Sequence, residues 1–432
     1  MPTGGRRRVV IVGGGFGGLS AAKTFMNSDV DVTLIDKTNH HLFQPLLYQV
    51  ATAALSPGDV AQPIRSILRS SRNLHVVMTT VTTIDTQRKE VITSDGAYRY
   101  DTLILAPGAR HSYFGHEEWE RNAPGLKDLS DALLIRERIL RTFEEAEHHA
   151  ATVVARTMLT FVVVGGGPTG VELAGAIAEI SLRTMLPDFP RLKRSDVRVI
   201  LVEGGPRILS SFSDSHSAKA VKMLQRLGVE VMCDSAVSDV NDHGVMVGNE
   251  FIASRNVIWA AGNKASLLLE TLDVELDRAG RVLVNPDCSV PLLSDVFVIG
   301  DGAHFDTPNG PLPGVAQVAM QQGVYVAKLI KKNIPREGRA PFRYRDYGTM
   351  ATIGRAKAVA HVFGIRSSGL IAWLMWAVIH VMQVLSCRNR LKVMVEWMWY
   401  YISFQPGARL IIDRDEVSPA GSTQPKIDLK QR

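Results

Sequence analysis

Short apolar runs, each closed by glycines and followed by a helix-like segment, form the dominant pattern of this chain. One run lies at 8–12 (RVVIV) and another at 160–164 (TFVVV), and both lead directly into clusters of glycine. Runs of this length rich in Val are typical of strands buried in a parallel sheet. The sequence therefore predicts two α/β units of strand, turn and helix.

The two glycine clusters have the same spacing, Gly-x-Gly-x-x-Gly. Such glycines allow a tight turn, a close approach of the backbone to a pyrophosphate and close packing of helix on strand. The helix N-terminus then offers free N–H groups to the phosphates. One motif alone is as often a plain glycine-rich turn, but two in the same context predict two dinucleotide sites. The glycines are Gly13, Gly15 and Gly18 in the first unit and Gly165, Gly167 and Gly170 in the second.

Each unit continues with a second apolar strand that ends at an acid. The first, at 30–35 (VDVTLI), ends at Asp36, and the second, at 197–202 (VRVILV), ends at Glu203. An acid at this place binds ribose hydroxyls and repels a 2′-phosphate, which favours NADH over NADPH at Glu203. The alternative for Asp36 is a solvated loop residue. The stretch 183–195, with two prolines, is expected to be an inserted loop.

Two later segments extend the first unit. An apolar run at 102–108 (TLILAPG) breaks at Pro-Gly, and the run at 296–299 leads into Gly-Asp-Gly around Asp301. The second segment resembles the second flavin motif of the two-dinucleotide flavoprotein reductases, in which the aspartate binds the ribityl chain of FAD. This resemblance implies FAD in the first site, a nicotinamide in the second, and an FAD domain split in two by the NADH domain.

The segment 315–330 has helical periodicity and begins after Pro313-Gly314. A helix N-terminus there would stabilise the anionic edge of a reduced flavin by about 0.3–2 kcal/mol. Gln317 and Gln321, four residues apart, share one face of this helix, and their apolar neighbours predict burial. Glu172 is expected in the first turn of the helix after Gly170, where the helix dipole alone favours an acid. A catalytic role for Glu172 therefore needs a separate argument.

By these residues the chain resembles the type II (non-proton-pumping) NADH:quinone oxidoreductases, from about Arg8 to about Arg409. The most specific stretches are 39–57 (NHHLFQPLLYQVATAALSP), 165–172 (GGGPTGVE), 300–303 (GDGA) and 316–323 (AQVAMQQG). The resemblance implies respiratory-chain electron transport and places 39–57 beside the flavin. It also implies that the positions of Glu172 and Gln317 lie near the nicotinamide and quinone ends of the flavin. Many relatives have a glutamate at the position of Asp36. The aspartate should still bind a ribose.

Motifs and resemblance together give the candidate site residues. Glu172 and Gln317 are the catalytic candidates, and no metal site is expected. Non-covalent FAD is assigned to Gly13, Gly15, Phe16, Gly17, Gly18, Asp36, Lys37, Val81, Ala106, Gly108, Asp301, Ala316 and Gln317. NADH is assigned to Gly165, Gly167, Gly170, Glu172, Glu203 and Gly262, and the quinone to Gln317, Gln321 and Ile379.

The C-terminal part changes composition sharply. After a strand-like segment at 347–363, the run 369–385 is apolar nearly all round. Its 17 residues make a helix of about 25 Å, short of a hydrocarbon core of about 30 Å, so a helix lying in the interface fits better than a spanning one. A second helix at 391–404 is rich in aromatics and has Arg388, Arg390 and Lys392 beside it. These features predict a monotopic anchor on anionic lipid. The alternative to the anchor is a buried helical hairpin or a dimer interface, and the segment can serve as both anchor and interface. His380 is expected to be a core residue.

Composition narrows the number of domains and the classes of protein that the chain can belong to. A chain of 432 residues with 46% hydrophobic content suits two large domains plus an appendage. The charge of +6 suggests an acidic partner surface, and the absence of a basic stripe with aromatics argues against nucleic acid. The three cysteines, Cys233, Cys288 and Cys387, are far apart, which excludes a disulfide reductase and argues against a sulfide:quinone oxidoreductase. A soluble NADH-dependent flavoprotein with another acceptor stays open.

The prediction is thus an α/β protein with two Rossmann-like dinucleotide-binding domains, of the two-dinucleotide flavoprotein reductase type, plus a membrane-anchoring helical segment. It oxidises NADH by hydride transfer to FAD and reduces a membrane quinone, ubiquinone or menaquinone. Gln317 is expected to bind the quinone carbonyl and Glu172 to help deliver protons. We expect a homodimer at the cytoplasmic face of the inner membrane. The predicted domains are 6–120 and 276–345 (FAD), 121–275 (NADH), 346–410 (C-terminal strands and anchor) and 411–432 (flexible tail).

Overall fold

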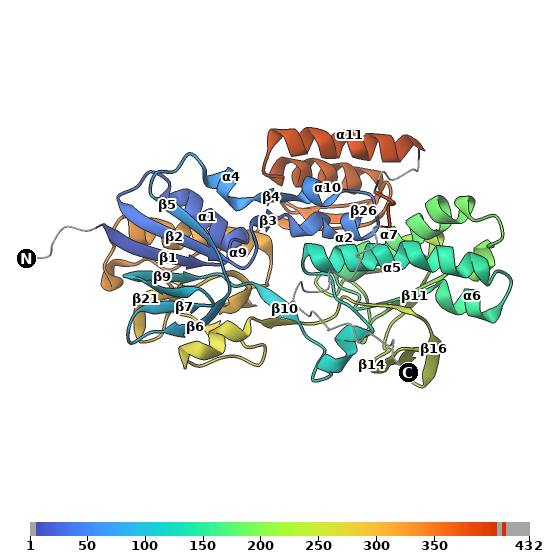
Figure 1. The fold of residues 1–432 in the computed structure, drawn as a ribbon, viewed down its shortest axis with the longest axis horizontal. Coiled ribbons are helices and arrows are strands. Elements are labelled where there is room, and N and C mark those ends of the chain that lie inside the picture. The colour runs from blue at the N-terminus through green and yellow to red at the C-terminus, as the bar shows by residue number, and fades with distance from the viewer. Residues whose placement is uncertain (1–5, 404–407, 412–432) are drawn as a thin grey trace, which may run out of the picture.

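The computed structural model describes residues 6–403 and 408–411. Two sheet-centred domains lie side by side along the long axis, and a smaller C-terminal sheet with two helices lies along one side of the pair (Figure 1). The predicted tail falls outside the described residues beyond Ile411. The domain boundaries given above stay a prediction.

The first domain is built on a six-stranded sheet of order β20-β21-β9-β1-β2-β5. All neighbours are parallel except β20, which is antiparallel to β21. Because β21 comes from far along the chain and pairs with β9, this sheet is made of two separate chain segments, as the resemblance implied. The helices α1 (Phe16–Phe25) and α9 (Ala316–Lys331) pack against each other beside it. The strands are β1 (Arg7–Val12), β2 (Val30–Asp36), β5 (Leu74–Met78), β9 (Thr102–Leu105), β20 (Ser289–Val290) and β21 (Leu293–Val298).

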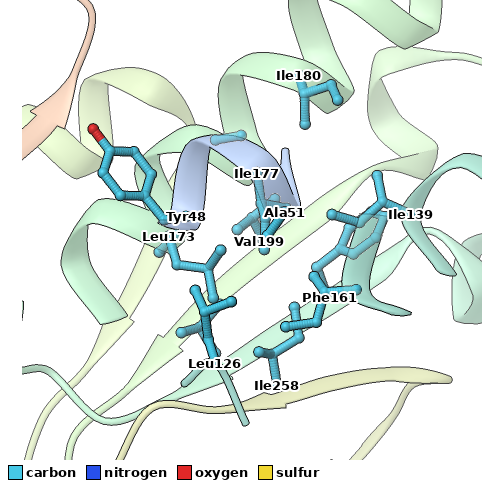
Figure 2. Packing of buried hydrophobic residues seen from close by; sticks show 14 of the residues in the cluster. Tyr48, Ala51, Leu126, Ile139, Phe161, Leu173, Ile177, Ile180, Val199 and Ile258 are labelled. Atoms are coloured by element: carbon cyan, nitrogen blue, oxygen red, sulfur yellow. The ribbon is translucent and has the colours of Figure 1, made fainter. Parts of the chain in front are cut away.

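The second domain has a four-stranded parallel sheet of order β13-β12-β11-β17. Figure 2 shows its apolar core, where Phe161, Val199 and Ile258 of the strands meet side chains of the covering helices. The strands are β11 (Thr160–Val164), β12 (Arg198–Val202), β13 (Val229–Met232) and β17 (Asn256–Trp259). The helices are α5 (Leu129–His148), α6 (Val153–Met158), α7 (Pro168–Glu179) and α8 (Asp214–Leu227). A separate antiparallel sheet is formed by β14 (Val237–Asn241), β15 (Gly244–Val247) and β16 (Glu250–Ala253).

The prediction of an inserted loop at 183–195 is wrong for much of its length. The chain continues from α7 as a π-helical segment, Ile180–Met185, followed by short 3₁₀ turns at Leu186–Asp188 and Arg194–Asp196. The reason is apolar burial: Met185, Phe189 and Leu192 pack into the domain core. The prolines suggested a loop, whereas burial of these side chains accompanies a helical segment that continues to Asp188.

The C-terminal part begins with an antiparallel sheet of β25 (Gly348–Gly354), β26 (Lys357–Val362) and β27 (Ile365–Ser368). The helices α10 (Leu370–Gln383) and α11 (Cys387–Ser403) follow. The second helix thus starts before the predicted 391, and Phe404 lies outside the described residues. Among the helices that the structure describes, none has both the length and the hydropathy to cross a membrane.

Short elements complete the fold. The antiparallel pair β10 (Ala109–His111) and β18 (Asn263–Ala265) lies where the chain passes between the two domains (Figure 1). The others are α2 (Leu47–Ala51), α3 (Pro57–Val60), α4 (Ile64–Leu68), β3 (His40–Leu42), β4 (Ala61–Pro63), β6 (Val81–Asp85), β7 (Glu90–Thr93), β8 (Gly96–Arg99), β19 (Val282–Leu283), β22 (Ala303–His304), β23 (Asp306–Thr307) and β24 (Gly310–Pro311).

Candidate active site

The first glycine turn connects β1 to α1 and leaves one side of the helix N-terminus open. Gly13 has φ +99°, and a Cβ there would lie 2.8 Å from the carbonyl carbon of Ala106. A Cβ on Gly18 would overlap the carbonyl group of Gly13. Gly15, the N-cap of α1, has no atom within 4 Å of such a Cβ. The turn is therefore tightly packed on its protein side and open at the cap, which fits a pyrophosphate.

Asp36 ends β2 beside this turn. Its Oδ2 accepts a hydrogen bond from the N–H of Gly14 at 2.6 Å, and its Oδ1 accepts from the N–H of Thr38 at 2.7 Å. These contacts fix the carboxylate at the end of the strand and leave lone pairs for ribose hydroxyls. Lys37 is exposed, and the ring of Phe16 contacts His41 edge-on.

Asp301 lies in the 3₁₀ turn Gly300–Gly302 after β21. Within the described part of the chain its carboxylate has no hydrogen-bond partner. Burial raises its pKa, against the opposing influence of the cations Lys127 and Arg281. A Cβ on Gly314 would lie 3.1 Å from Asp301 Oδ1, so only glycine passes this carboxylate without crowding. A half-buried acid without a protein partner fits a ribityl hydroxyl, and the residues present fit FAD.

The other FAD candidates differ in their surroundings. Gly108 has φ +72° and open space around it, and Ala106 is half-buried beside the glycine turn. Val81 begins β6 and packs against the core of the first domain. Ala316 is the first residue of α9, and Gln317 Oε1 accepts a hydrogen bond from Tyr344 Oη at 3.4 Å.

The second glycine turn repeats the construction of the first. A Cβ on Gly165 (φ +110°) would lie 2.7 Å from the N of Ala261, and Gly167, the N-cap of α7, is open. Glu203 Oε2 accepts from the N–H of Gly166 at 2.6 Å, and its Oε1 accepts from the N–H of Gly205 at 2.7 Å. Two further candidates complete the turn: a Cβ on Gly170 would overlap the carbonyl group of Gly165, and Gly262 has φ +69°.

Glu172 does not lie in the first turn of its helix, which corrects the prediction. Because α7 begins at Pro168, Glu172 is in the second turn, where the dipole effect has largely decayed. Its Oε1 accepts from the N–H of Thr352 at 3.3 Å, and burial raises its pKa to about 8. The helix dipole therefore does not explain this acid, and the structure makes it a carboxyl that holds its proton near neutral pH.

Glu172 lines a cavity of about 60 Å³ that no sequence motif indicated. Tyr48 Oη shares a hydrogen bond with Thr352 Oγ1 at 3.1 Å and accepts one from Gln49 Nε2 at 2.9 Å. Trp397 Nε1 in turn donates to Gln49 Oε1 at 2.7 Å. In Figure 2 the hydroxyl of Tyr48 points away from the apolar core. The lining residues are Tyr48, Gln49, Thr52, Ala54, Glu172, Ala176, Glu179, Thr352, Gly354, Arg355, Trp373, Trp376 and Trp397.

The other quinone candidates are not among the residues that line this cavity. Gln321 is half-buried, and its side chain exchanges hydrogen bonds with the backbone of Arg345. Gln317 is half-buried too, so the predicted burial of this pair holds only in part. Gln322, the next residue on α9, is fully buried, and its Oε1 accepts a hydrogen bond from the N–H of Gly300 at 2.7 Å. Helical spacing could have found it, since it shares a face with Val326. Ile379 packs in a small apolar cluster between α10 and β26.

Comparison with known proteins decides the family. Residues 7–323 match the family model "Pyridine nucleotide-disulphide oxidoreductase", and residues 347–403 match the NDH2 C-terminal domain. The chain is 42% identical to the type II NADH:quinone oxidoreductase Ndh of Mycobacterium tuberculosis over 95% of its length and 91% of the relative's. The chain belongs to the type II NADH:quinone oxidoreductases. The enzyme of that name from Staphylococcus haemolyticus is 31% identical over 87% of this chain and 94% of its own.

Solved structures agree on the fold of this type II oxidoreductase. NDH2 from Plasmodium falciparum in complex with NADH superposes with a TM-score of 0.86 at 20% identity, covering 95% of this chain and 100% of that one. The sulfide:quinone oxidoreductase of Aquifex aeolicus gives 0.72 at 17% identity, covering 92% and 96%. At these identities the likeness concerns the fold alone.

The C-terminal helices of this type II oxidoreductase have two distinct faces. Trp376, Val381, Val393 and Trp397 point into the protein. His380 Nδ1 contacts the carbonyl of Trp376 at 2.8 Å, and burial lowers its pKa to about 4. The side chain is half-buried, so the predicted core position holds only in part. The opposite face exposes Leu370, Ile371, Leu374, Val378 and Met382 on α10 and Leu391, Met394, Val395, Met398 and Trp399 on α11.

Two of the three cations predicted beside this face are bound to groups of the protein. Arg388 is exposed, whereas Arg390 Nε donates to the carbonyl of Val384 at 2.8 Å. Lys392 Nζ pairs with Asp59 Oδ1 at 2.6 Å. The reason is tertiary: α3 brings Asp59 beside the start of α11, which sequence spacing did not reveal.

Proposed function

We propose that this chain oxidises NADH and reduces a quinone through non-covalently bound FAD, without pumping protons. The observation that carries the proposal is the repeated site: two tight glycine turns with open helix caps, each beside an acid bound to the turn's backbone. Two such sites serve two dinucleotides. Bound FAD would supply hydride acceptance and passage of two electrons to the quinone.

The residues of the chain hold the two nucleotides in different ways. Asp36 and the cap at Gly15 would bind the adenosine half of FAD, and Asp301 its ribityl chain. The carboxylate of Glu203 is fixed beside the second turn, because backbone N–H groups hold both of its oxygens. A 2′-phosphate would meet this charge, which supports NADH as the substrate over NADPH.

Gln317 and Glu172 are proposed to act on the quinone. Gln317 at the start of α9 would donate its amide to a quinone carbonyl. Glu172 would give a proton to the quinone oxygen, and its raised pKa supports this role because the carboxyl is protonated near neutral pH. Gln321 and Ile379 stay in the proposed quinone site.

The exposed apolar face of α10 and α11 supports a peripheral, monotopic position on a membrane. A contiguous apolar surface on an amphipathic helix pair is typical of interfacial helices. We assign an anionic lipid surface and the cytoplasmic face of the inner membrane, where NADH is present. A homodimer belongs to the same proposal, and light scattering of the detergent-solubilised protein tests it.

The test is a steady-state assay of purified protein with NADH or NADPH and a short-chain quinone, followed through the flavin spectrum. Rapid NADH oxidation that depends on quinone, with weak use of NADPH, is expected. Glu172→Gln should slow quinone reduction and leave flavin reduction by NADH intact; equal slowing of both would overturn its role. Bleaching of the flavin by NADH without quinone turnover would point to the alternative, an NADH-dependent flavin reductase with another acceptor.

A further inference from the structure

A second cavity lies at the start of α8, between the NADH domain and the C-terminal sheet. Its volume is about 270 Å³, close to the lower limit of about 300 Å³ for pockets that hold small molecules. Six of its seven lining residues are polar or basic, and none of them belongs to the two glycine turns. They are Ser211, Phe212, Ser213, His216, Thr349, His361 and Arg366. The cavity therefore suits a small polar ligand at a place that no motif indicated.

His216 has a buried nitrogen without a partner in the wall of this cavity. The side chain is 3% exposed, and its Nδ1 has no hydrogen-bond partner in the part of the chain that the structure describes. Buried polar atoms nearly always have a hydrogen-bond partner, because leaving one unpaired costs free energy. The unpaired Nδ1 therefore indicates that a group from outside the chain completes this hydrogen bond.

The groups that face His216 make its surroundings basic. Burial lowers the pKa of this imidazole, and Lys219, Arg366 and His361 lower it further, against the opposing effect of a hydrogen bond to the backbone. These three groups come from α8, β27 and β26, whereas β25 adds only the uncharged Thr349 to the lining. None of the three forms an ion pair within the described residues. Positive charge is thus concentrated here without a carboxylate bound to it.

The first turn of α8 adds to this positive potential. The first N–H groups of an α-helix have no partner within the helix, and the helix dipole is positive at this end. Ser213 Oγ accepts from the N–H of His216 at 3.4 Å, which leaves the N–H groups of Asp214 and Ser215 for a ligand. The carboxylate of Asp214 is 93% exposed and pairs with Arg207 Nε at 3.4 Å. Basic side chains and a helix N-terminus at one cavity favour an anion.

We propose that this cavity binds the phosphate group of a small anionic molecule, at a site separate from both nucleotide turns. The planar guanidinium of Arg366 can bind two phosphate oxygens, and the N–H groups of α8 can bind a third. The imidazole of His216 is doubly protonated in this complex, so that its Nδ1–H donates to the phosphate. The inference goes beyond NADH oxidation and does not depend on it.

The phosphate can belong to a soluble molecule or to a lipid headgroup. Strand β27, which carries Arg366, ends at Ser368, and α10 with its exposed apolar face begins two residues later at Leu370. Both sources offer the same group to the cavity, so the tests below include one probe for each.

The first test is calorimetric titration of the detergent-solubilised holoenzyme with inorganic phosphate. The decisive variant is Arg366→Gln, and the matched control is Arg226→Gln, an exposed arginine in the last turn of α8. Arg366→Gln should weaken phosphate binding about tenfold, the usual effect of losing a hydrogen bond to a charged group, whereas Arg226→Gln should keep the wild-type affinity. Both variants should retain their flavin and its reduction by NADH, which shows that the fold is intact.

Two further arms define the site. Saturating NADH should not displace phosphate, because the lining contains no residue of the glycine turns. Flotation with phosphatidylcholine vesicles, with and without phosphatidic acid, identifies the source. If Arg366→Gln also weakens flotation with the acidic vesicles, the phosphate is that of a lipid headgroup; if only the titration changes, it is that of a soluble molecule. Absence of phosphate binding by wild type, equal affinity in Arg366→Gln and Arg226→Gln, or displacement by NADH would overturn the proposal.

Titration with sulfate across pH tests the contact with His216. Sulfate keeps its charge at about pH 5–8, where histidines titrate. In His361→Gln, His216 is the imidazole that remains in the lining. A bound anion favours the charged imidazole and raises its pKa, so sulfate affinity should increase as the pH falls. The added change His216→Gln should remove this dependence. An affinity that stays constant with pH in His361→Gln would place the anion away from His216 and overturn the proposal.

Discussion

Replacing Glu172 by glutamine should make folding stability less dependent on pH. The amide oxygen can still accept the hydrogen bond from Thr352 N–H, so the packing of α7 against β25 is retained. The variant cannot ionise, whereas burial raises the pKa of the native carboxyl from 4.5 to about 8. The difference between the two proteins therefore isolates the cost of the buried charge.

The sign and size follow from linkage. Between pH 4.5 and 8 the unfolded chain has already lost the proton of Glu172 while the folded chain keeps it, so rising pH favours unfolding. Each pH unit in this window lowers the free energy of unfolding of the wild-type protein by about 1.4 kcal/mol. Above pH 8 this loss stays constant at about 5 kcal/mol. From pH 6 to pH 9 the wild-type protein should lose about 3 kcal/mol relative to Glu172→Gln. Glu179 titrates in both proteins and cancels to first order.

The assay is thermal unfolding of both holoenzymes at several pH values from 6 to 9, with FAD in excess. For a chain of this length the unfolding entropy is about 0.9 kcal/mol per degree, so the variant should gain about 3 °C relative to wild type across the range. If the domains unfold separately, the shift in unfolding temperature is larger for the domain that carries Glu172, because a single domain has a smaller unfolding entropy. The exposed Glu144→Gln serves as control. A difference between Glu172→Gln and wild type that stays constant with pH would refute the reasoning, since it would show that Glu172 ionises at an ordinary pKa.

Three further predictions test other parts of the molecule. Glu203→Gln should narrow the preference for NADH over NADPH by about tenfold in kcat/KM, equivalent to about 1.4 kcal/mol; an unchanged ratio would show that this charge does not select the nucleotide. Gly18→Ala should abolish flavin binding or folding, because its Cβ would overlap the carbonyl of Gly13, whereas Gly15→Ala should fold and bind FAD more weakly. The flavin-to-protein absorbance ratio after purification distinguishes them, and equal flavin content in both would contradict this account. Leu374→Asp on the exposed face of α10 should reduce flotation with anionic vesicles while flavin reduction by NADH persists; undiminished flotation would show that this face does not contact lipid.

The sequence alone determined the features that depend on residues close together in the chain. The overlap that requires glycine at Gly18 is with Gly13, five residues away, and the same holds for Gly170 and Gly165. Strands such as Thr160–Val164 could be placed to within a residue because their composition and the following turn are local signals. The two-domain α/β fold follows from the order of these local units.

Only the tertiary structure decided the environment of Glu172. Its hydrogen-bond donor, Thr352, lies 180 positions further along the chain, and the tryptophans that line its cavity come from α10 and α11. The same is true of Lys392, whose exposed side chain pairs with Asp59. A pKa depends on desolvation and on the charges that the fold brings nearby, and no local pattern encodes them. The sequence thus located the nucleotide turns, whereas packing of distant segments made an acid on α7 into a half-buried group with a raised pKa.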